Sequence, residues 1–196
     1  MAKVKKPSLE VIQKIKDGQS MSVISEYLNE FIEHNSVIKT AQKELDENDI
    51  SDRLWCKPLL LMVEYHITDD TMLSDVQLGR NVQLEHVYPT HPKKNEWTHI
   101  TKEISAQYLN SAGNITLIGG SKNNEASNKS FGEKITAYQG ERGGGTTPFE
   151  ITRKIIKDYD DGTYQEEWNE AAMCDRKKWF IQEVYKILEI PVSGNE

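Results

Sequence analysis

The sequence predicts a mainly α-helical fold that contains a small two-stranded β element. Over most of the chain, apolar residues recur at three- and four-residue spacing, which is typical of amphipathic helices. One such stripe consists of Ile24, Tyr27, Leu28, Phe31 and Ile32. The spacing changes at Val82-Gln83-Leu84-Glu85, where apolar and polar residues alternate as in a half-buried strand. Residues 114–118 form a second short strand candidate.

The N-terminal part, residues 1–79, is predicted to be a helical region that packs on the rest of the fold. Residues 8–66 carry mostly helical patterns, and Asp17-Gly18 followed by Ser20 marks the start of the helix with the apolar stripe. Residues 37–45 form a second, more polar helical candidate. Pro58 lies within the apolar stretch 54–65, so it either begins that helix or kinks it.

The C-terminal part, residues 80–196, is predicted to hold both strands and the remaining helices. Pro89 ends the first strand and opens an irregular loop, and a short helix is expected within residues 97–109. Gly119-Gly120-Ser121 is expected to form a turn after the second strand. Three more helices are expected, over residues 124–138, 148–159 and 164–188.

Composition excludes several classes of protein. Of the 196 residues, 37% are hydrophobic and 28% are charged, as in a globular protein that is neither disordered nor embedded in a membrane. The longest apolar run, residues 59–63, is too short to span a bilayer, and the basic N-terminus lacks the apolar core of a signal peptide. The two cysteines, Cys56 and Cys174, indicate neither a disulfide framework nor a structural zinc site. A reducing, cytoplasmic location is therefore expected.

The net charge of −7 disfavours a simple nucleic-acid binder, because neutralising phosphates requires lysine and arginine. A basic strip can nevertheless lie on an acidic protein, and basic residues do gather in the central segment of this chain. They are Lys93, Lys94, Lys122, Lys129, Lys134 and Arg142. The charge therefore leaves DNA binding open.

Chemically active side chains stand at the ends of the two predicted strands and near a helix start. Glu85 and His86 close the first strand, Asn114 opens the second, and Asn123 follows about nine residues later. Hydrolysis of a phosphodiester needs an activated water and relief of charge on the phosphate. A neutral histidine can take a proton from water, and one Mg²⁺-like ion held by oxygen ligands can offset the charge. Glu85 and His86 would point to opposite faces of a regular strand, so both would border one cleft only if the chain twists or bulges near Pro89.

Three motifs follow one another in the order of a known nuclease family. They are Glu85-His86-Val87-Tyr88-Pro89, Gly113-Asn114-Ile115-Thr116-Leu117, and Asn123-Asn124-Glu125-Ala126-Ser127-Asn128 followed by Phe131 and Lys134. At these residues the chain resembles the HNH, or ββα-metal, nucleases. It resembles more closely the C-terminal nuclease domain of GmrSD-type, modification-dependent (type IV) restriction enzymes. The resemblance extends over roughly residues 80–188, with weaker agreement around residues 53–65.

This resemblance implies a role for each residue of the motifs. His86 would be the general base, Glu85 and Asn123 would bind a divalent metal, most often Mg²⁺ and alternatively Mn²⁺, and Asn114 would orient the loop that carries His86. Asn128 would cap the helix or add a ligand. Lys134 and Arg176 are candidates for phosphate contact, with a structural role open for both.

The resemblance also implies a substrate and a context for the domain. The expected activity is endonucleolytic hydrolysis of modified or foreign DNA in defence against phage. Many relatives carry an N-terminal nucleotide-dependent sensor domain, and this chain has no GxxxxGK[ST] phosphate loop. The chain is therefore expected to be the nuclease part of a longer protein, or to act with a partner that senses the DNA.

Other interpretations of the same residues stay open at this point. Asn123 can serve as a helix N-cap, and a shift of one residue at the helix start would present Asn124 in its place. A zinc site could recruit His91 and His99 with His86, although their spacing matches no known zinc motif. Two other classes of function are a catalytically inactive DNA-binding module on the same scaffold and a helical protein-interaction module.

Overall fold

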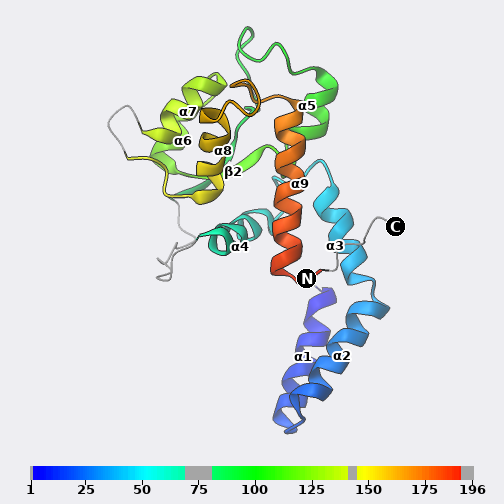
Figure 1. Cartoon of the computed structure of the whole chain (residues 1–196). Coiled ribbons are helices and arrows are strands. Elements are labelled where there is room, and N and C mark those ends of the chain that lie inside the picture. Colours follow the sequence, from blue (N-terminus) through cyan, green and yellow to red (C-terminus); the bar gives the residue numbers. More distant parts are fainter. Residues whose placement is uncertain (1, 69–80, 141–144, 191–196) are drawn as a thin grey trace. The chain divides into compact units, whose positions relative to one another are not determined.

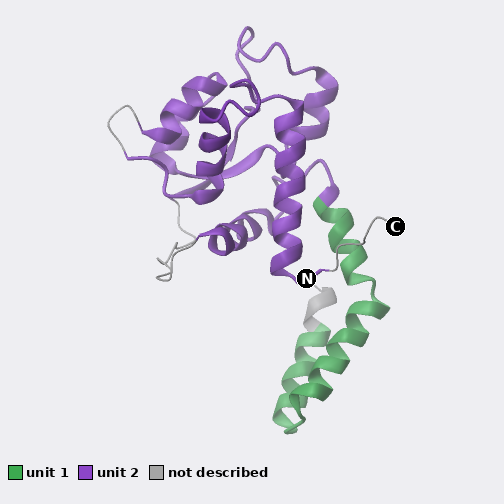
Figure 2. Cartoon of the chain, viewed as in Figure 1, with its two compact units in different colours: residues 1–45 green, residues 46–196 purple. Residues whose placement is uncertain are grey.

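The computed structural model describes residues 2–68, 81–140 and 145–190. These residues are mostly helical and include one two-stranded antiparallel sheet, which confirms the predicted fold class (Figure 1). The chain divides into two compact units, residues 1–45 and residues 46–196 (Figure 2). The predicted boundary between residues 79 and 80 lies outside the described residues, and whether the first region packs on the second stays a prediction.

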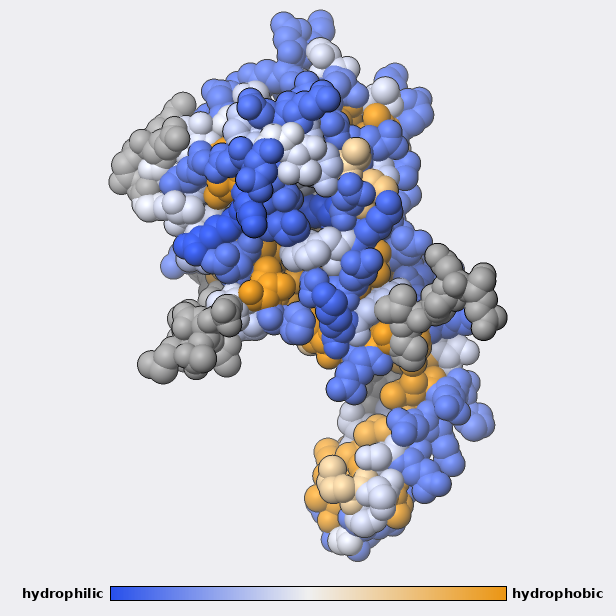
Figure 3. Space-filling model, viewed as in Figure 1, coloured by the Kyte–Doolittle hydropathy of each residue, from blue (hydrophilic) through white to orange (hydrophobic). Residues whose placement is uncertain are grey.

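The first unit consists of α1 (Ala2–Lys16), α2 (Met21–His34) and most of α3 (Val37–Asp46). Gly18, with a φ of +67°, lets the chain reverse after α1, and Ser20 precedes α2 as its N-cap, as the sequence indicates. Apolar side chains of this helix pair are exposed, and Figure 3 shows hydrophobic colour on its surface. They include Leu9, Ile12, Ile15 and Met21.

The second unit is built around the sheet. Its helices and strands are α4 (Cys56–Ile67), β1 (Val82–His86), α5 (Lys102–Tyr108), β2 (Ile115–Gly119), α6 (Gly120–Ala126), α7 (Phe131–Gln139), α8 (Glu150–Asp160) and α9 (Glu170–Ile187). β1 pairs with β2 in a register that runs from Val82 opposite Gly119 to His86 opposite Ile115. α6 packs on both strands, so the order strand, strand, helix makes a ββα unit. The two strand predictions are confirmed.

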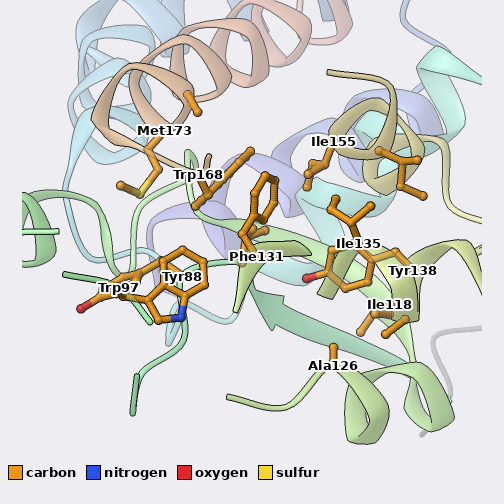
Figure 4. Close-up of a cluster of buried hydrophobic side chains, with 14 of the residues drawn as sticks. Tyr88, Trp97, Ile118, Ala126, Phe131, Ile135, Tyr138, Ile155, Trp168 and Met173 are labelled. Atoms are coloured by element: carbon orange, nitrogen blue, oxygen red, sulfur yellow. The ribbon is translucent and has the colours of Figure 1, made fainter. Parts of the chain in front are cut away.

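The core lies between the sheet and the helices that follow it (Figure 4). Trp168, from the segment before α9, packs against Phe131 at the start of α7, with ring centroids 5.4 Å apart. Tyr88 meets Trp97 edge to face at 5.3 Å, a favourable aromatic geometry. This packing fixes the loop after β1, which carries Tyr88, against the rest of the unit.

The single helix predicted over residues 124–138 is wrong, because the structure has two helices there. α6 begins at Gly120, so the predicted turn at Gly119-Gly120-Ser121 is instead the N-cap and first residues of a helix. Ser127, with a φ of +43°, breaks the helical path. Ser130 and Glu133 then form a capping box that starts α7. The second helix therefore has its own start signal, four residues after α6 ends.

Gly113, directly before Asn114, allows the chain to pass close to α9. A Cβ at this position would stand 2.1 Å from the backbone oxygen of Met173. Gly113→Ala is therefore expected to lower the free energy of unfolding by about 1–3 kcal/mol, measured by urea denaturation. Gly145→Ala is the control, because a Cβ there meets nothing within 4 Å and Gly145 is exposed outside the helices and strands. Equal stability of the two variants would contradict the close approach.

Candidate active site

His86 is the last residue of β1, and its ring is half-buried on one face of the sheet. The ring atom Nε2 lies 3.1 Å from Oδ1 of Asn110. Burial lowers the pKa of His86, the charge of Lys134 lowers it further, and the Asn110 hydrogen bond and the charge of Asp52 act in the opposite direction. The net direction is downward, so the imidazole is neutral near pH 7 and can accept a proton.

Asn114, fully buried before β2, holds the loop after His86 through its side chain and its backbone. Its Oδ1 accepts hydrogen bonds from the backbone N–H of Tyr88 at 2.7 Å and from Nε1 of Trp168 at 3.0 Å. Its Nδ2 donates to the carbonyls of Tyr88 at 2.9 Å and of Leu109 at 2.8 Å. The backbone oxygen of Asn114 also accepts from the N–H of Val87 at 3.0 Å. This arrangement suits the orienting role that the resemblance implies for Asn114.

Asn110 is a site residue that the sequence reasoning missed. It lies just after α5 and contacts the ring of His86 through its amide, while its carbonyl accepts from the N–H of Ile50 at 3.0 Å. The segment around Asp49 forms a short parallel bridge with Asn110. Asn110 is therefore held from two sides. In the sequence, Asn110 is marked only by its position four residues before Asn114. This position does not reveal a contact with His86, which lies 24 residues earlier in the chain.

Glu85 points to the other face of β1 and forms a buried ion pair. Its Oε1 accepts from Nζ of Lys134 at 2.6 Å and from the hydroxyl of Tyr138 at 2.9 Å, both on α7. Nζ of Lys134 also donates to the carbonyl of His86 at 2.8 Å. Burial raises the pKa of Glu85 and lowers the pKa of Lys134. The structure thus brings Glu85 to Lys134 and places the His86 ring on the opposite side of the strand.

Asn123 lies on α6, and its Nδ2 donates to Oε1 of Gln83 on β1. The N-cap of α6 is Gly119, so the capping alternative for Asn123 is wrong. Asn124 and Asn128 are exposed, which makes Asn123 the asparagine of this motif that faces the sheet. Gln83 alternates with Glu85 on one face of β1, so Asn123 approaches the face opposite His86.

Lys134 and Arg176 do not reach the surface as phosphate contacts, because both are buried. Lys134 forms an ion pair with Glu85, and the NH2 group of Arg176 donates a hydrogen bond to Oγ1 of Thr116 at 3.2 Å. Thr116 in turn lies 2.8 Å from the hydroxyl of Thr152 on α8. Of the two roles that the sequence leaves open for these cations, their burial and their hydrogen bonds support the structural one.

The oxygen donors near the sheet can be tested for their fit to a divalent cation. The described parts of the chain contain no group of three or more His, Cys, Asp or Glu side chains that could hold a metal ion. Glu85 is 5% exposed and its charge is offset by an ammonium group, so its carboxylate does not fit a metal ligand in this arrangement. The zinc alternative also lacks a cluster, since His91 contacts Thr90 and His99 contacts the carbonyl of Trp168.

The site therefore consists of a neutral histidine, an amide that holds its ring and a buried asparagine that fixes the adjoining loop. Comparison with protein families matches residues 11–183 to the GmrSD restriction endonucleases, C-terminal domain. Comparisons with curated proteins and with solved structures give no match. The family match covers most of the chain and includes every motif described above. The chain belongs to the family of GmrSD restriction endonuclease C-terminal domains, and so to the nuclease domains that act on DNA.

Proposed function

We propose that this domain is an HNH-type endonuclease in which His86 is the general base. The observation that supports the proposal is the environment of the His86 ring. The ring is half-buried, its pKa is lowered by this burial, and Asn110 holds it through a hydrogen bond. A base must be unprotonated at the working pH and fixed in direction, and this setting meets both requirements. The family match supplies the reaction class, hydrolysis of DNA phosphodiester bonds.

The contact with Asn110 selects one tautomer of His86. An amide oxygen only accepts hydrogen bonds, so the ring proton sits on Nε2 and the basic lone pair on Nδ1. Nδ1 takes a proton from water while the water oxygen attacks phosphorus and the P–O bond to the leaving oxygen breaks, and the leaving oxygen then takes a proton from solvent. The nearby charge of Asp52 favours the imidazolium that forms. Asn114 keeps the loop after His86 in place during this step.

Dependence on a divalent metal, Mg²⁺ or Mn²⁺, is part of the proposal, and such an ion supplies charge relief on the phosphate. Glu85 and Asn123 remain the ligands that the resemblance implies. Glu85 could serve only by leaving Lys134, and breaking a buried ion pair costs about 3–5 kcal/mol. We therefore assign no catalytic step to an ion held at Glu85.

A supercoiled-plasmid assay tests the reaction and its metal requirement together. The wild-type domain is incubated with Mg²⁺, with Mn²⁺ and with excess EDTA. Nicked or linear product is expected with either metal, and EDTA is expected to remove it. Undiminished cleavage in EDTA would contradict metal dependence. No cleavage under any of the three conditions would contradict the nuclease proposal and favour an inactive DNA-binding or interaction module.

The substrate proposed for the full system is modified or foreign DNA, and the proposed role is restriction of phage in the cytoplasm. The family name supports restriction, and a sensing domain or partner would supply the choice of DNA. None of the described helices is both long and apolar enough to cross a membrane. Comparing cleavage of phage DNA with and without base modification tests the preference.

A further inference from the structure

A pocket of about 430 Å³ opens next to the residues that hold His86. Ala106, Leu109 and Asn110 form one wall, because spacings of three and four residues place them on the same side of α5 and the residues that follow it. Tyr88, Asn48 and Asp49 also line the pocket. Asn110 belongs both to this wall and to the contact with the His86 ring, so the pocket lies one side chain away from the proposed base.

The wall shared with the active site is rigidly held. Nδ2 of Asn114 donates to the carbonyls of both Tyr88 and Leu109. The carbonyl of Asn110 accepts from the N–H of Ile50, which ties the segment that carries Asp49 to the same wall. The pocket is therefore pre-formed, and its position relative to His86 is fixed by hydrogen bonds that Asn114 and Asn110 make.

The lining of the pocket suits a flat, uncharged group with polar edges. Ile100 and Leu109 provide apolar contact, and amide and carboxylate groups of Asn48, Asp49 and Asn110 can exchange hydrogen bonds. Asp49 is an acid and Lys102 a base, so the lining has little net charge. A bare phosphate would meet the carboxylate of Asp49 as well as the ammonium of Lys102, so the lining as a whole does not favour an anion. A nucleobase combines apolar faces with donor and acceptor edges, and amides and carboxylates are the groups that recognise such edges.

We propose that this pocket is a nucleoside subsite, which receives a base of the DNA strand beside the scissile phosphate. The inference rests on the proposed nuclease function, because it is the place of His86 that makes the neighbouring pocket part of a DNA path. Occupation of the pocket would require an unpaired or flipped base, and it would anchor the strand while its phosphate lies at His86.

Filling the pocket tests this proposal. Ala106 is exposed on α5, so Ala106→Trp is expected to fold normally and to occupy the pocket. Gln107→Trp, at an exposed position on the same helix that does not line the pocket, is the matched control. Each variant is assayed on an oligonucleotide and on an abasic oligonucleotide of equal length, a phosphodiester chain that carries no nucleobase.

Ala106→Trp is expected to lower kcat/KM for the oligonucleotide by about 10-fold or more, the scale of one lost base contact. Hydrolysis of the abasic oligonucleotide should stay within about 2-fold of wild type, and Gln107→Trp should leave both substrates unchanged. Unchanged cleavage of the oligonucleotide by Ala106→Trp would overturn the subsite, as would an equal loss on both substrates.

A binding measurement separates failure of the subsite from failure of the nuclease function. Fluorescence anisotropy compares a single-stranded oligonucleotide with an abasic strand of equal length, and it needs no turnover. Ala106→Trp should weaken binding of the normal strand and leave the abasic strand unaffected. If the wild type cleaves neither substrate but Ala106→Trp still weakens binding of the normal strand alone, the nuclease proposal is contradicted. The nucleobase-binding role of the pocket is then still supported. Equal binding of both strands by the wild type would overturn the subsite.

Discussion

His86→Ala is expected to lower the rate of DNA cleavage by about 10²–10⁴-fold, the usual contribution of a positioned general base. The ring touches Asn110 and lies at the end of a strand, so its loss removes the proton acceptor and one hydrogen bond. DNA affinity should stay within a few-fold of wild type, since binding relies on other groups. Single-turnover cleavage and anisotropy measure the two quantities separately.

His91→Ala is the control for this variant. His91 is exposed in the loop that follows β1, and its ring hydrogen-bonds to the neighbouring Thr90. Its replacement should leave the cleavage rate unchanged. Equal rates for wild type and His86→Ala would remove His86 from the mechanism, and a parallel loss in both histidine variants would indicate damage to the loop.

Lys134→Met is expected to destabilise the domain by about 3–5 kcal/mol, because it leaves the carboxylate of Glu85 buried without its cation. Lys134 is 0% exposed and Glu85 is 5% exposed, so water cannot replace the lost partner. With Lys134 absent, burial acts on Glu85 unopposed by the ammonium, and the pKa of Glu85 rises further above its ordinary value. A carboxyl whose pKa is higher in the folded state than in the unfolded state stabilises the fold at pH values below its unfolded-state pKa, and this stabilisation is lost as the pH rises. The loss of folding free energy in Lys134→Met should therefore be smallest in acid.

Two further variants define what Lys134→Met measures. The double variant Glu85→Gln with Lys134→Met removes both charges and should recover part of the lost stability. Lys93→Met, which breaks the pair between exposed Lys93 and half-buried Glu96, should cost no more than about 1 kcal/mol. Chemical denaturation at several pH values gives the free energy of unfolding of the wild type and of the three variants. A Lys134→Met cost as small as that of Lys93→Met would contradict the buried pair.

The strands and the central motifs could be predicted because their signals are local. The alternation of apolar and polar residues at Val82-Gln83-Leu84-Glu85 predicts the strand. Because neighbouring side chains of a strand point to opposite faces, it also predicts that Glu85 and His86 face opposite sides of the sheet, as observed. The break at Ser127 was missed because residues 124–138 were interpreted as one continuous helical pattern. The capping box at Ser130, which marks the start of a second helix, is the local signal that could have revealed the break.

The partners of the site residues could not be predicted, since they come from distant segments. Lys134 is 49 residues from Glu85, and Asn110 is 24 residues from His86. Residue type alone left Lys134 as a possible surface charge, and only the packing of α7 on the sheet places its ammonium in the core. Asn110 shows no pattern of its own, and its role depends on the bridge between its segment and Asp49.

The pH dependence of single-turnover cleavage tests most directly whether neutral His86 is the base. Burial and Lys134 lower the pKa of His86, so activity should be lost only as the pH falls through a midpoint below about 6.5, the ordinary value for histidine. The residual activity of His86→Ala should lack this acid limb. A wild-type midpoint above 6.5, or the same acid limb in His86→Ala, would contradict the account.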